Sequence, residues 1–320
     1  MDKRFYKVIS LFIKAMLLFA SFYYIIQKLT TTVAFASYHS IAFSPATTFY
    51  LFLSLLLMLL NWSLEAKKWQ VLIAPYEKVS FFQSLQSILA GVTISIFTPN
   101  RVGEFTGRVF FLKQADKLKA SVKSIIGSFL QLSITLICGL TGIWLYIKKR
   151  YDSTVPLYSV FNQQKKYAFI LVIFCVLIVS LAIFRLSFFT KLKHQLKEIF
   201  NVKTAELIQV FLLSFNRYLV FTLQYYILLL TMGVAIEPVQ AFILIAITFF
   251  ITSVIPTFAL TEIVVRSAVA VYIFGILDPA QPLLIASASL LLWIINLAIP
   301  ALIGSVFIGK LQFFKTQGWK

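Results

Sequence analysis

Charged residues are scarce in this sequence. Only 12% of its 320 residues are Asp, Glu, Lys or Arg, whereas a soluble globular domain carries about a quarter. Hydrophobic residues make up 60% of the chain, and phenylalanine alone occurs 33 times. These proportions exclude an ordinary soluble protein. They indicate an all-α integral membrane protein in which residues 1–320 form a single transmembrane domain.

Cysteine and histidine are rarer still. The two cysteines, Cys138 and Cys175, lie inside apolar runs, which favours neither a disulfide framework nor a metal site. The two histidines, His39 and His194, lie in predicted loops. The sequence contains no HExxH motif, nucleophile elbow, Walker A loop or glycine-rich dinucleotide turn. We therefore expect no enzyme activity, no catalytic residue, no metal or other cofactor, and no ATP-driven transport.

The formal net charge of +18 would suggest nucleic acid as a partner of a soluble protein. Here most basic residues lie in short loops between apolar runs. Membrane topology and anionic lipid headgroups explain such loops better than nucleic acid does. We therefore expect no nucleic-acid partner, and the sequence identifies no protein partner.

A membrane-spanning helix needs roughly 20 apolar residues. Six segments meet this length, namely 8–26, 44–64, 124–147, 167–184, 207–230 and 283–308. Two further regions are interrupted by proline. Residues 81–97 are apolar, break at Pro99 and resume around 101–112; residues 239–255 are apolar, break at Pro256 and resume over 258–277.

The two interrupted regions share a motif, Pro-x4-Glu-x3-Arg in the first and Pro-x5-Glu-x3-Arg in the second. We interpret them as repeat elements around 81–112 and 239–277. Each is predicted to return to the side from which it enters the membrane. Because three predicted spans separate them, the two elements should be inverted, one opening from each face. Such proline-interrupted segments are typical of a central site in a transporter.

Basic residues predict the orientation of the chain. With both termini in the cytoplasm, cytoplasmic segments hold 17 Lys and Arg residues and external segments hold 6, in line with the positive-inside rule. The segment 148–166 is predicted to be external although it contains five of these six. This orientation leaves its basic character unexplained.

Six charged residues are predicted to lie deep in the membrane, where a charge costs about 2.5–3.5 kcal/mol on insertion scales. They are Arg101, Glu104, Arg108, Arg217, Glu262 and Arg266. Each Glu precedes an Arg by four positions, the favourable orientation for an ion pair on a helix. Arginine suits phosphate oxygens two at a time. The sequence therefore predicts a site for a lipid phosphate, with Asn100 as the N-cap of a half-helix whose dipole faces the cavity.

Other interpretations remain open for these residues. Both Glu–Arg pairs could be purely structural, and Arg101 could be an interfacial arginine. Arg217 has no acidic partner in its own helix, so it must pair across helices or meet a ligand.

Three further predictions concern less prominent polar residues. Glu65, Lys67 and Lys68 resemble a solvated boundary after the second helix. Ser87, Gly91 and Ser95 form a small-residue stripe that favours close helix packing. Hydrogen bonds between helices are predicted for Gln83, Gln86, Gln131 and Gln224.

The ExxxR segments also occur in intramembrane prenyl-protein proteases, but those enzymes need histidines on membrane helices to hold a metal, which disfavours that class. The segments TPNRVGEFTGR and PTFALTEIVVR, with the helix pattern around them, instead resemble the membrane domain of lysylphosphatidylglycerol synthases and stand-alone flippase-like proteins. The resemblance covers roughly residues 8–308. It implies functional positions at Pro99, Gly103, Glu104 and Arg108, and at Pro256, Glu262 and Arg266.

The second segment departs from the family pattern, because Thr257, Phe258 and Ala259 stand where glycines are expected. The synthases also carry a soluble transferase domain after the membrane part, so we expect this chain not to be the synthase. We expect a multi-pass protein of the bacterial inner membrane that translocates or binds an anionic phospholipid or a polyprenyl-phosphate lipid. The alternatives are a secondary carrier for a small anion and a membrane scaffold subunit.

Overall fold

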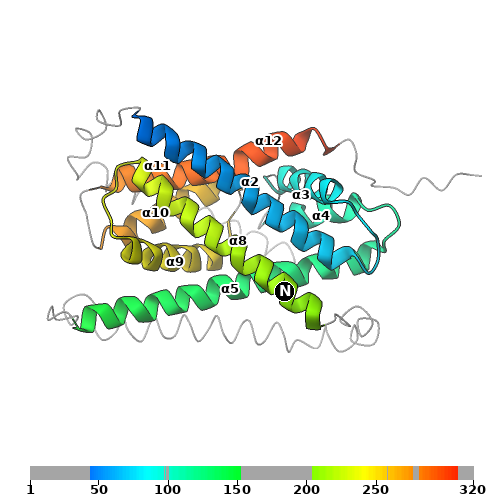
Figure 1. Cartoon of the computed structure of the whole chain (residues 1–320), viewed down its shortest axis with the longest axis horizontal. Coiled ribbons are helices and arrows are strands. Elements are labelled where there is room, and N and C mark those ends of the chain that lie inside the picture. Colours follow the sequence, from blue (N-terminus) through cyan, green and yellow to red (C-terminus); the bar gives the residue numbers. More distant parts are fainter. Residues whose placement is uncertain are drawn as a thin grey trace, which may run out of the picture. The chain divides into compact units, whose positions relative to one another are not determined.

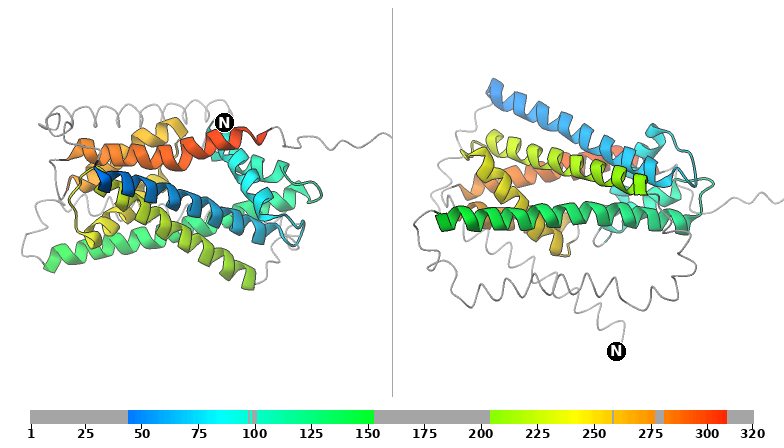
Figure 2. Two further views of the ribbon diagram at one scale, coloured as in Figure 1. Left: turned by 45° about the horizontal axis from the view of Figure 1, so that its top comes forward. Right: turned by 60° about the horizontal axis from the view of Figure 1, so that its bottom comes forward.

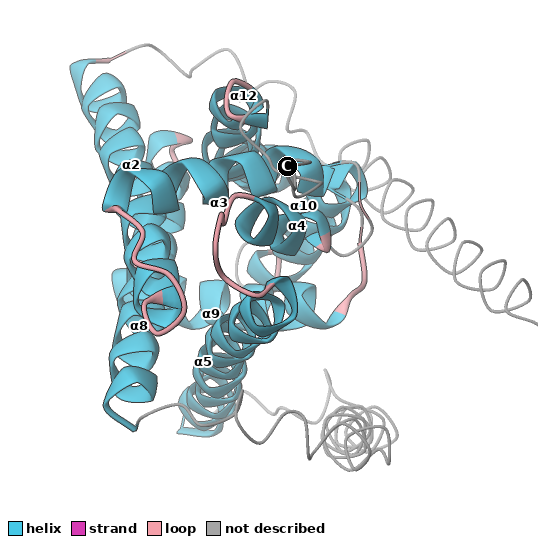
Figure 3. Cartoon of the chain, turned by 90° about the vertical axis from the view of Figure 1, so that its right-hand side faces the viewer, coloured by secondary structure: helices cyan, strands magenta, loops and turns pink. Residues whose placement is uncertain are grey.

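The computed structural model describes residues 44–96, 98, 101–152, 204–257, 259–276 and 281–308, and within these ranges it contains helices and loops but no strand (Figure 3). The predicted spans 8–26 and 167–184 lie outside the described residues, as do Pro99 and Asn100. The chain divides into two compact units, Met1–Gly142 with Ala205–Lys320, and Ile143–Thr204. All tertiary contacts discussed below lie within the first unit.

Four helices of the described residues are long and apolar enough to cross a membrane. They are α2 (Pro45–Ile73), α5 (Lys117–Asp152), α8 (Thr204–Thr231) and the continuous series α11 (Pro282–Trp293), η4 (Ile294–Ala298) and α12 (Ile299–Ser305). They correspond to the predicted spans 44–64, 124–147, 207–230 and 283–308. The protein is therefore an all-helical, polytopic membrane protein, as predicted.

Helix α2 begins with a capping residue, since the Ser44 hydroxyl accepts a hydrogen bond of 3.1 Å from the Thr47 N–H. The helix continues nine residues past the predicted end at residue 64. Glu65 and Lys68 lie on this extension and are only 1% and 2% exposed, whereas Lys67 is exposed. The predicted solvated boundary is therefore wrong for Glu65 and Lys68, because both face the protein interior.

Helix α5 also runs further than predicted, since the backbone is helical to Asp152. The basic residues at 148–150 thus lie at the C-terminal end of a helix, where the helix dipole favours positive charge. The Lys148 ammonium lies 5.5 Å from the centre of the Trp144 ring. This placement accounts for three of the five basic residues in the segment 148–166; Lys165 and Lys166 lie outside the described residues.

The first hairpin consists of α3 (Phe81–Ile96) and α4 (Gly103–Phe110), which pack closely because glycines meet at their interface. A Cβ atom at Gly103 would lie 2.7 Å from the Ile94 carbonyl carbon, and one at Gly91 would lie 2.7 Å from the Glu104 carbonyl oxygen. A Cβ atom at Gly107 would collide with the backbone of Gly91. The close packing predicted for the Gly91 stripe is confirmed.

The N-terminus of α4 is capped from the preceding turn. The Thr98 hydroxyl accepts a hydrogen bond of 2.8 Å from the Gly103 N–H, and the N-cap position itself is Val102. The predicted cap, Asn100, lies outside the described residues. The capping role of Asn100 therefore stays a prediction.

The second hairpin consists of α9 (Pro238–Val254) and α10 (Ala259–Phe274). Helix α9 ends before Pro256, and Ile255 has the extended backbone (φ −81°, ψ 117°) that a following proline imposes. The break therefore forms where the sequence predicted it, although no glycine stands there.

Within the first unit the two hairpins lie at opposite ends of the long helices α2 and α8 (Figures 1 and 2). The first hairpin follows the C-terminal end of α2, the second follows the C-terminal end of α8, and these two helices run in opposite directions (Figure 1). Helix α10 also contacts α3, so the hairpins meet. Their inversion across a bilayer stays a prediction.

Candidate functional site

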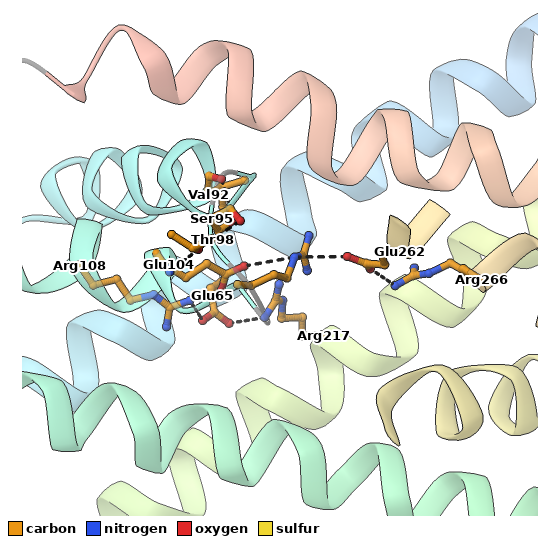
Figure 4. Close-up of polar contacts among 11 residues, drawn as sticks. Glu65, Val92, Ser95, Thr98, Glu104, Arg108, Arg217, Glu262 and Arg266 are labelled. Carbon is orange, nitrogen blue, oxygen red and sulfur yellow. Dashed lines mark hydrogen bonds and ion pairs between the residues drawn. The ribbon is translucent and has the colours of Figure 1, made fainter. Parts of the chain in front are cut away.

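Eight charged side chains form one connected set of ion pairs, which we call the ion network. Figure 4 shows part of this network. They come from α2, from the break before α4, and from α4, α8 and α10. The members are Glu65, Lys68, Arg101, Glu104, Arg108, Arg217, Glu262 and Arg266. The structure thus brings all six predicted charged residues together and adds two that the sequence had placed at a boundary.

Glu65 is the centre of one half of the ion network. Its carboxylate lies 2.6 Å from the Lys68 ammonium, 2.7 Å from Nη2 of Arg108 and 2.5 Å from Nη1 of Arg217. At 1% exposure it is shielded from water, where an ionised carboxylate persists only if it is paired. The sequence pattern did not identify Glu65 as a buried charge, although its spacing to Lys68 allows an ion pair on a helix that continues past residue 64.

The predicted pair of Glu104 and Arg108 is present but is the weaker of two contacts. Nη2 of Arg108 lies 3.4 Å from Glu104 and 2.7 Å from Glu65. Arg108 is 3% exposed, and its Nε and Nη1 atoms have no hydrogen-bond partner among the described residues. Arg108 therefore ties the first hairpin to α2.

Arg101 connects the two hairpins. Its Nε atom lies 3.8 Å from the Glu104 carboxylate and 3.5 Å from the Glu262 carboxylate. Its φ of +57° lies in the left-handed region, which costs a non-glycine residue roughly 1–3 kcal/mol. The second hairpin supplies the predicted Glu262–Arg266 pair at 2.5 Å.

Arg217 is held on three sides in the middle of α8. Its Nε atom donates a hydrogen bond of 2.8 Å to Asn61, its Nη1 atom binds Glu65, and its guanidinium lies 5.3 Å from the centre of the Trp62 ring. The sequence predicted that this residue pairs across helices or meets a ligand, and Glu65 is a partner across helices. These three contacts fix the orientation of the guanidinium.

A chain of buried amides supports Arg217 from behind. Asn61 donates to Asn296 at 3.2 Å, Asn296 donates to Gln224 at 2.9 Å, and Gln224 donates to the Ser54 carbonyl at 2.8 Å. Asn296 lies in the π-helical turn η4, four residues before Pro300, which has no N–H to donate to the Asn296 carbonyl. Hydrogen bonds between helices, predicted for Gln224 and Gln131, are both present, the latter to the Ser214 carbonyl.

A cavity of about 590 Å³ lies beside the ion network. Four charged side chains line it: Arg101, Arg217, Glu262 and Arg266. The rest of its wall combines polar groups with a large apolar surface that includes Trp62, Tyr218, Phe221, Phe249, Leu292, Trp293 and Leu297. The lining residues Ser253, Val254 and Pro256 are exposed, so the cavity reaches the protein surface beside the break of the second hairpin.

The cavity-facing arginines are oriented by aromatic rings and by carboxylates. The Arg266 guanidinium lies 5.7 Å from the Phe221 ring centre and 6.0 Å from the Phe249 ring centre. Such stacking leaves the edges of a guanidinium available to hydrogen-bond acceptors. The three arginines and one carboxylate give the cavity wall a formal charge of +2, which favours an anion. No group of three or more His, Cys, Asp or Glu residues that could hold a metal occurs within the described ranges.

The comparison with protein families returned one finding. The model of the family described as the lysylphosphatidylglycerol synthase TM region matches residues 7–304, nearly the whole chain. The comparisons with curated proteins and with solved structures returned no match.

Proposed function

Because the chain belongs to the family of the lysylphosphatidylglycerol synthase TM region, a family of membrane proteins related to lipid handling, we propose that it translocates an anionic phospholipid or a polyprenyl-phosphate lipid between the leaflets of the bilayer. The observation that carries the proposal is the cavity, whose wall joins three arginines to a broad apolar surface. A lipid needs both, since its phosphate is charged and its tails are not. In this proposal the chain is not an enzyme and needs no cofactor.

Arg101, Arg217 and Arg266 would contact the phosphate, because they are the basic residues that line the cavity. Glu262 would orient two of these arginines. Glu104 and Arg108 do not line the cavity, so we assign them to positioning the first hairpin. The exposed lining residues at 253–256 offer a lateral path by which lipid tails can remain in the bilayer during movement of the headgroup.

The direct test is a leaflet-resolved assay in proteoliposomes. A fluorescent anionic lipid is placed in both leaflets, and an impermeant reductant added outside measures how fast inner lipid reaches the outer leaflet. The proposal expects movement well above the rate in protein-free vesicles. Movement at the protein-free rate by correctly folded protein would favour the scaffold interpretation, and uptake of soluble phosphate without lipid movement would favour a small-anion carrier.

Arg217→Gln is the most informative variant for this assay. It removes a charge from the cavity wall, whereas the amide of Gln can still form hydrogen bonds. We expect lipid movement to fall at least about tenfold, which corresponds to the loss of one charged hydrogen bond. Lys78→Gln removes one charge from an exposed loop residue and serves as the control. Loss of folded protein in Arg217→Gln, in place of lost transport, would assign Arg217 to structure.

We also propose that the protein resides in the bacterial inner membrane with both termini in the cytoplasm. The positive-inside rule supports this orientation. Single cysteines introduced at 153–166 and at 278–282 in a cysteine-free background should react with an impermeant thiol reagent from outside the cell. Labelling of either segment only after the membrane is permeabilised would show that the segment is cytoplasmic and would contradict the proposed orientation.

A further inference from the structure

The cavity wall carries a charge that the protein itself leaves uncompensated. Three arginines and one glutamate line it, giving a formal charge of +2. The complete ion network has the same excess, since its five basic side chains face three carboxylates. An uncompensated positive charge attracts counter-charge, so this excess favours an anionic ligand with two negative charges.

The three cavity-lining arginines also have unused hydrogen-bond donors. Nε of Arg266 is buried and forms no hydrogen bond within the described part of the chain, whereas Nε of Arg101 is buried and faces the carboxylates of Glu104 and Glu262 at 3.8 and 3.5 Å. Arg217 uses Nε and Nη1 on Asn61 and Glu65, and among the described residues its Nη2 has no partner. Because the side chains of Arg101, Arg217 and Arg266 all line the cavity, its wall offers guanidinium N–H donors to an anion.

The two kinds of lipid phosphate differ in both respects. A phosphate monoester at neutral pH carries about −1.5 to −2 charges and presents three terminal oxygens. A phosphodiester carries a single charge and has only two non-bridging oxygens. The monoester thus matches the uncompensated charge of +2 and presents more acceptor oxygens to the arginines, whereas the diester leaves one charge unmatched.

We propose that the cavity selects lipids whose headgroup ends in a phosphate monoester over lipids in which the phosphate is a diester. The inference rests on the proposed function and narrows it to one class of headgroup. Both phosphatidic acid and a polyprenyl monophosphate belong to this class.

The test compares two lipids that differ by one methyl group. Phosphatidic acid is a monoester, and phosphatidylmethanol with the same acyl chains is the smallest corresponding diester. Each is titrated into the purified full-length protein in neutral detergent at about pH 7.5, where the monoester is close to doubly charged. Trp62 and Trp293 line the cavity, so tryptophan fluorescence provides the binding signal. We expect the half-saturating concentration of phosphatidic acid to be lower by roughly tenfold or more.

Two variants shift the charge of the site in opposite directions. Arg101→Gln lowers the charge of the cavity wall to +1 and should reduce the preference for phosphatidic acid at least about threefold, whereas Arg101→Lys keeps the charge and should retain it. Glu104→Gln raises the charge of the ion network without touching the cavity wall and should maintain or increase the preference. If Arg101→Gln does not fold, the comparison of the two lipids on the unmodified protein and on Glu104→Gln still tests the preference for a monoester.

The outcomes separate this inference from the proposed function. Equal binding of the two lipids, or tighter binding of phosphatidylmethanol, overturns the inference and leaves lipid translocation standing. Binding of neither lipid removes the proposed function and the inference together. Soluble glycerol 3-phosphate is the third ligand: weak binding supports a lipid as the source of the monoester, and binding as tight as that of phosphatidic acid overturns a lipid ligand in favour of a small anion.

Discussion

The two hairpins carry the same Glu-x3-Arg motif but use it differently. In the first hairpin, Arg108 is 3% exposed, binds Glu65 of α2 and does not line the cavity. In the second hairpin, Arg266 is 14% exposed, pairs with Glu262 and lines the cavity. One copy of the motif therefore secures the fold and the other faces the candidate ligand. A repeated motif thus identifies equivalent positions in the chain but not equivalent tasks.

The packing of the hairpins differs in the same sense. Glu104 and Glu262 occupy equivalent motif positions, so Gly107 of α4 corresponds to Val265 of α10. Gly107 lies against the backbone of Gly91, whereas Val265 has a side chain, which is buried. The tight first hairpin can position buried charges accurately, and the looser second hairpin leaves space beside its charges for a cavity.

The largest effect is expected from a substitution in the half of the ion network that is centred on Glu65. Glu65→Gln removes the carboxylate shared by Lys68, Arg108 and Arg217, and we expect a loss of stability of about 3–5 kcal/mol because buried cations then lack their partner. Thermal unfolding in detergent, followed by size-exclusion chromatography, measures this loss. The matched change in the second half, Glu262→Gln, should cost clearly less, since that residue is more exposed and pairs with two cations. Equal losses would contradict the asymmetry.

The next effect concerns helix packing. Gly107→Val forces a side chain against the Gly91 backbone and should destabilise the protein by about 3 kcal/mol, at the upper end for overpacking. The substitution gives the first hairpin the valine that the second hairpin has at the equivalent position, Val265. Thermal unfolding in detergent measures this loss, and tolerance of Gly107→Val would show that the close approach of α3 and α4 is not required.

The third prediction sharpens the difference between the two arginines. Arg266→Gln should reduce lipid movement about tenfold with a small loss of stability, because the side chain faces the cavity. Arg108→Gln should instead reduce the yield of folded protein, because Arg108 is 3% exposed, does not line the cavity and ties the first hairpin to Glu65 of α2. Proteoliposome transport and detergent stability are measured on both variants. If both variants lost transport and kept their stability, both motifs would belong to the ligand site.

The smallest effect lies in the loops that hold the first hairpin in place. The Glu77 carboxylate accepts hydrogen bonds from the backbone N–H groups of Lys113, Gln114 and Ala115. Burial by itself raises the pKa of Glu77, but these hydrogen bonds and the nearby Lys113 charge outweigh it and lower the pKa. Glu77→Gln should cost about 1 kcal/mol.

The lowered pKa of Glu77 also predicts a pH dependence. Its contribution to stability should be complete above the pKa of about 4.3 that glutamate has in an unfolded chain, and it should disappear as the pH falls through the lower folded-state value. Stability measured between neutral and acidic pH should therefore fall less steeply at the acidic end in Glu77→Gln than in the unmodified protein. Parallel curves would mean that the loop interaction does not contribute.

Local features of the sequence determined a large part of this protein. Apolar length predicted the four described spans, and prolines predicted the two breaks, because both depend on neighbouring residues only. The motif identified four members of the ion network for the same reason, and Arg101 and Arg217 were identified as charges within apolar segments. Arg217 was expected to pair across helices or to meet a ligand. The predicted end of α2 at residue 64 was too early. The sequence does not distinguish a charged residue that faces water after a helix from one that faces the protein interior within it.

Only the tertiary structure decided how the charges are paired. Arg217 and Glu65 are 152 positions apart, and Asn61 and Asn296 are 235 apart, so no spacing in the sequence relates them. Glu65 gained its central position through the packing of α2 against α3, which also carried Arg108 toward it through the glycine contacts of α3 and α4. Hydrophobic length and proline act along the chain and can be predicted from the sequence, whereas ion pairs in a membrane interior depend on which helices meet, and only folding brings those helices together.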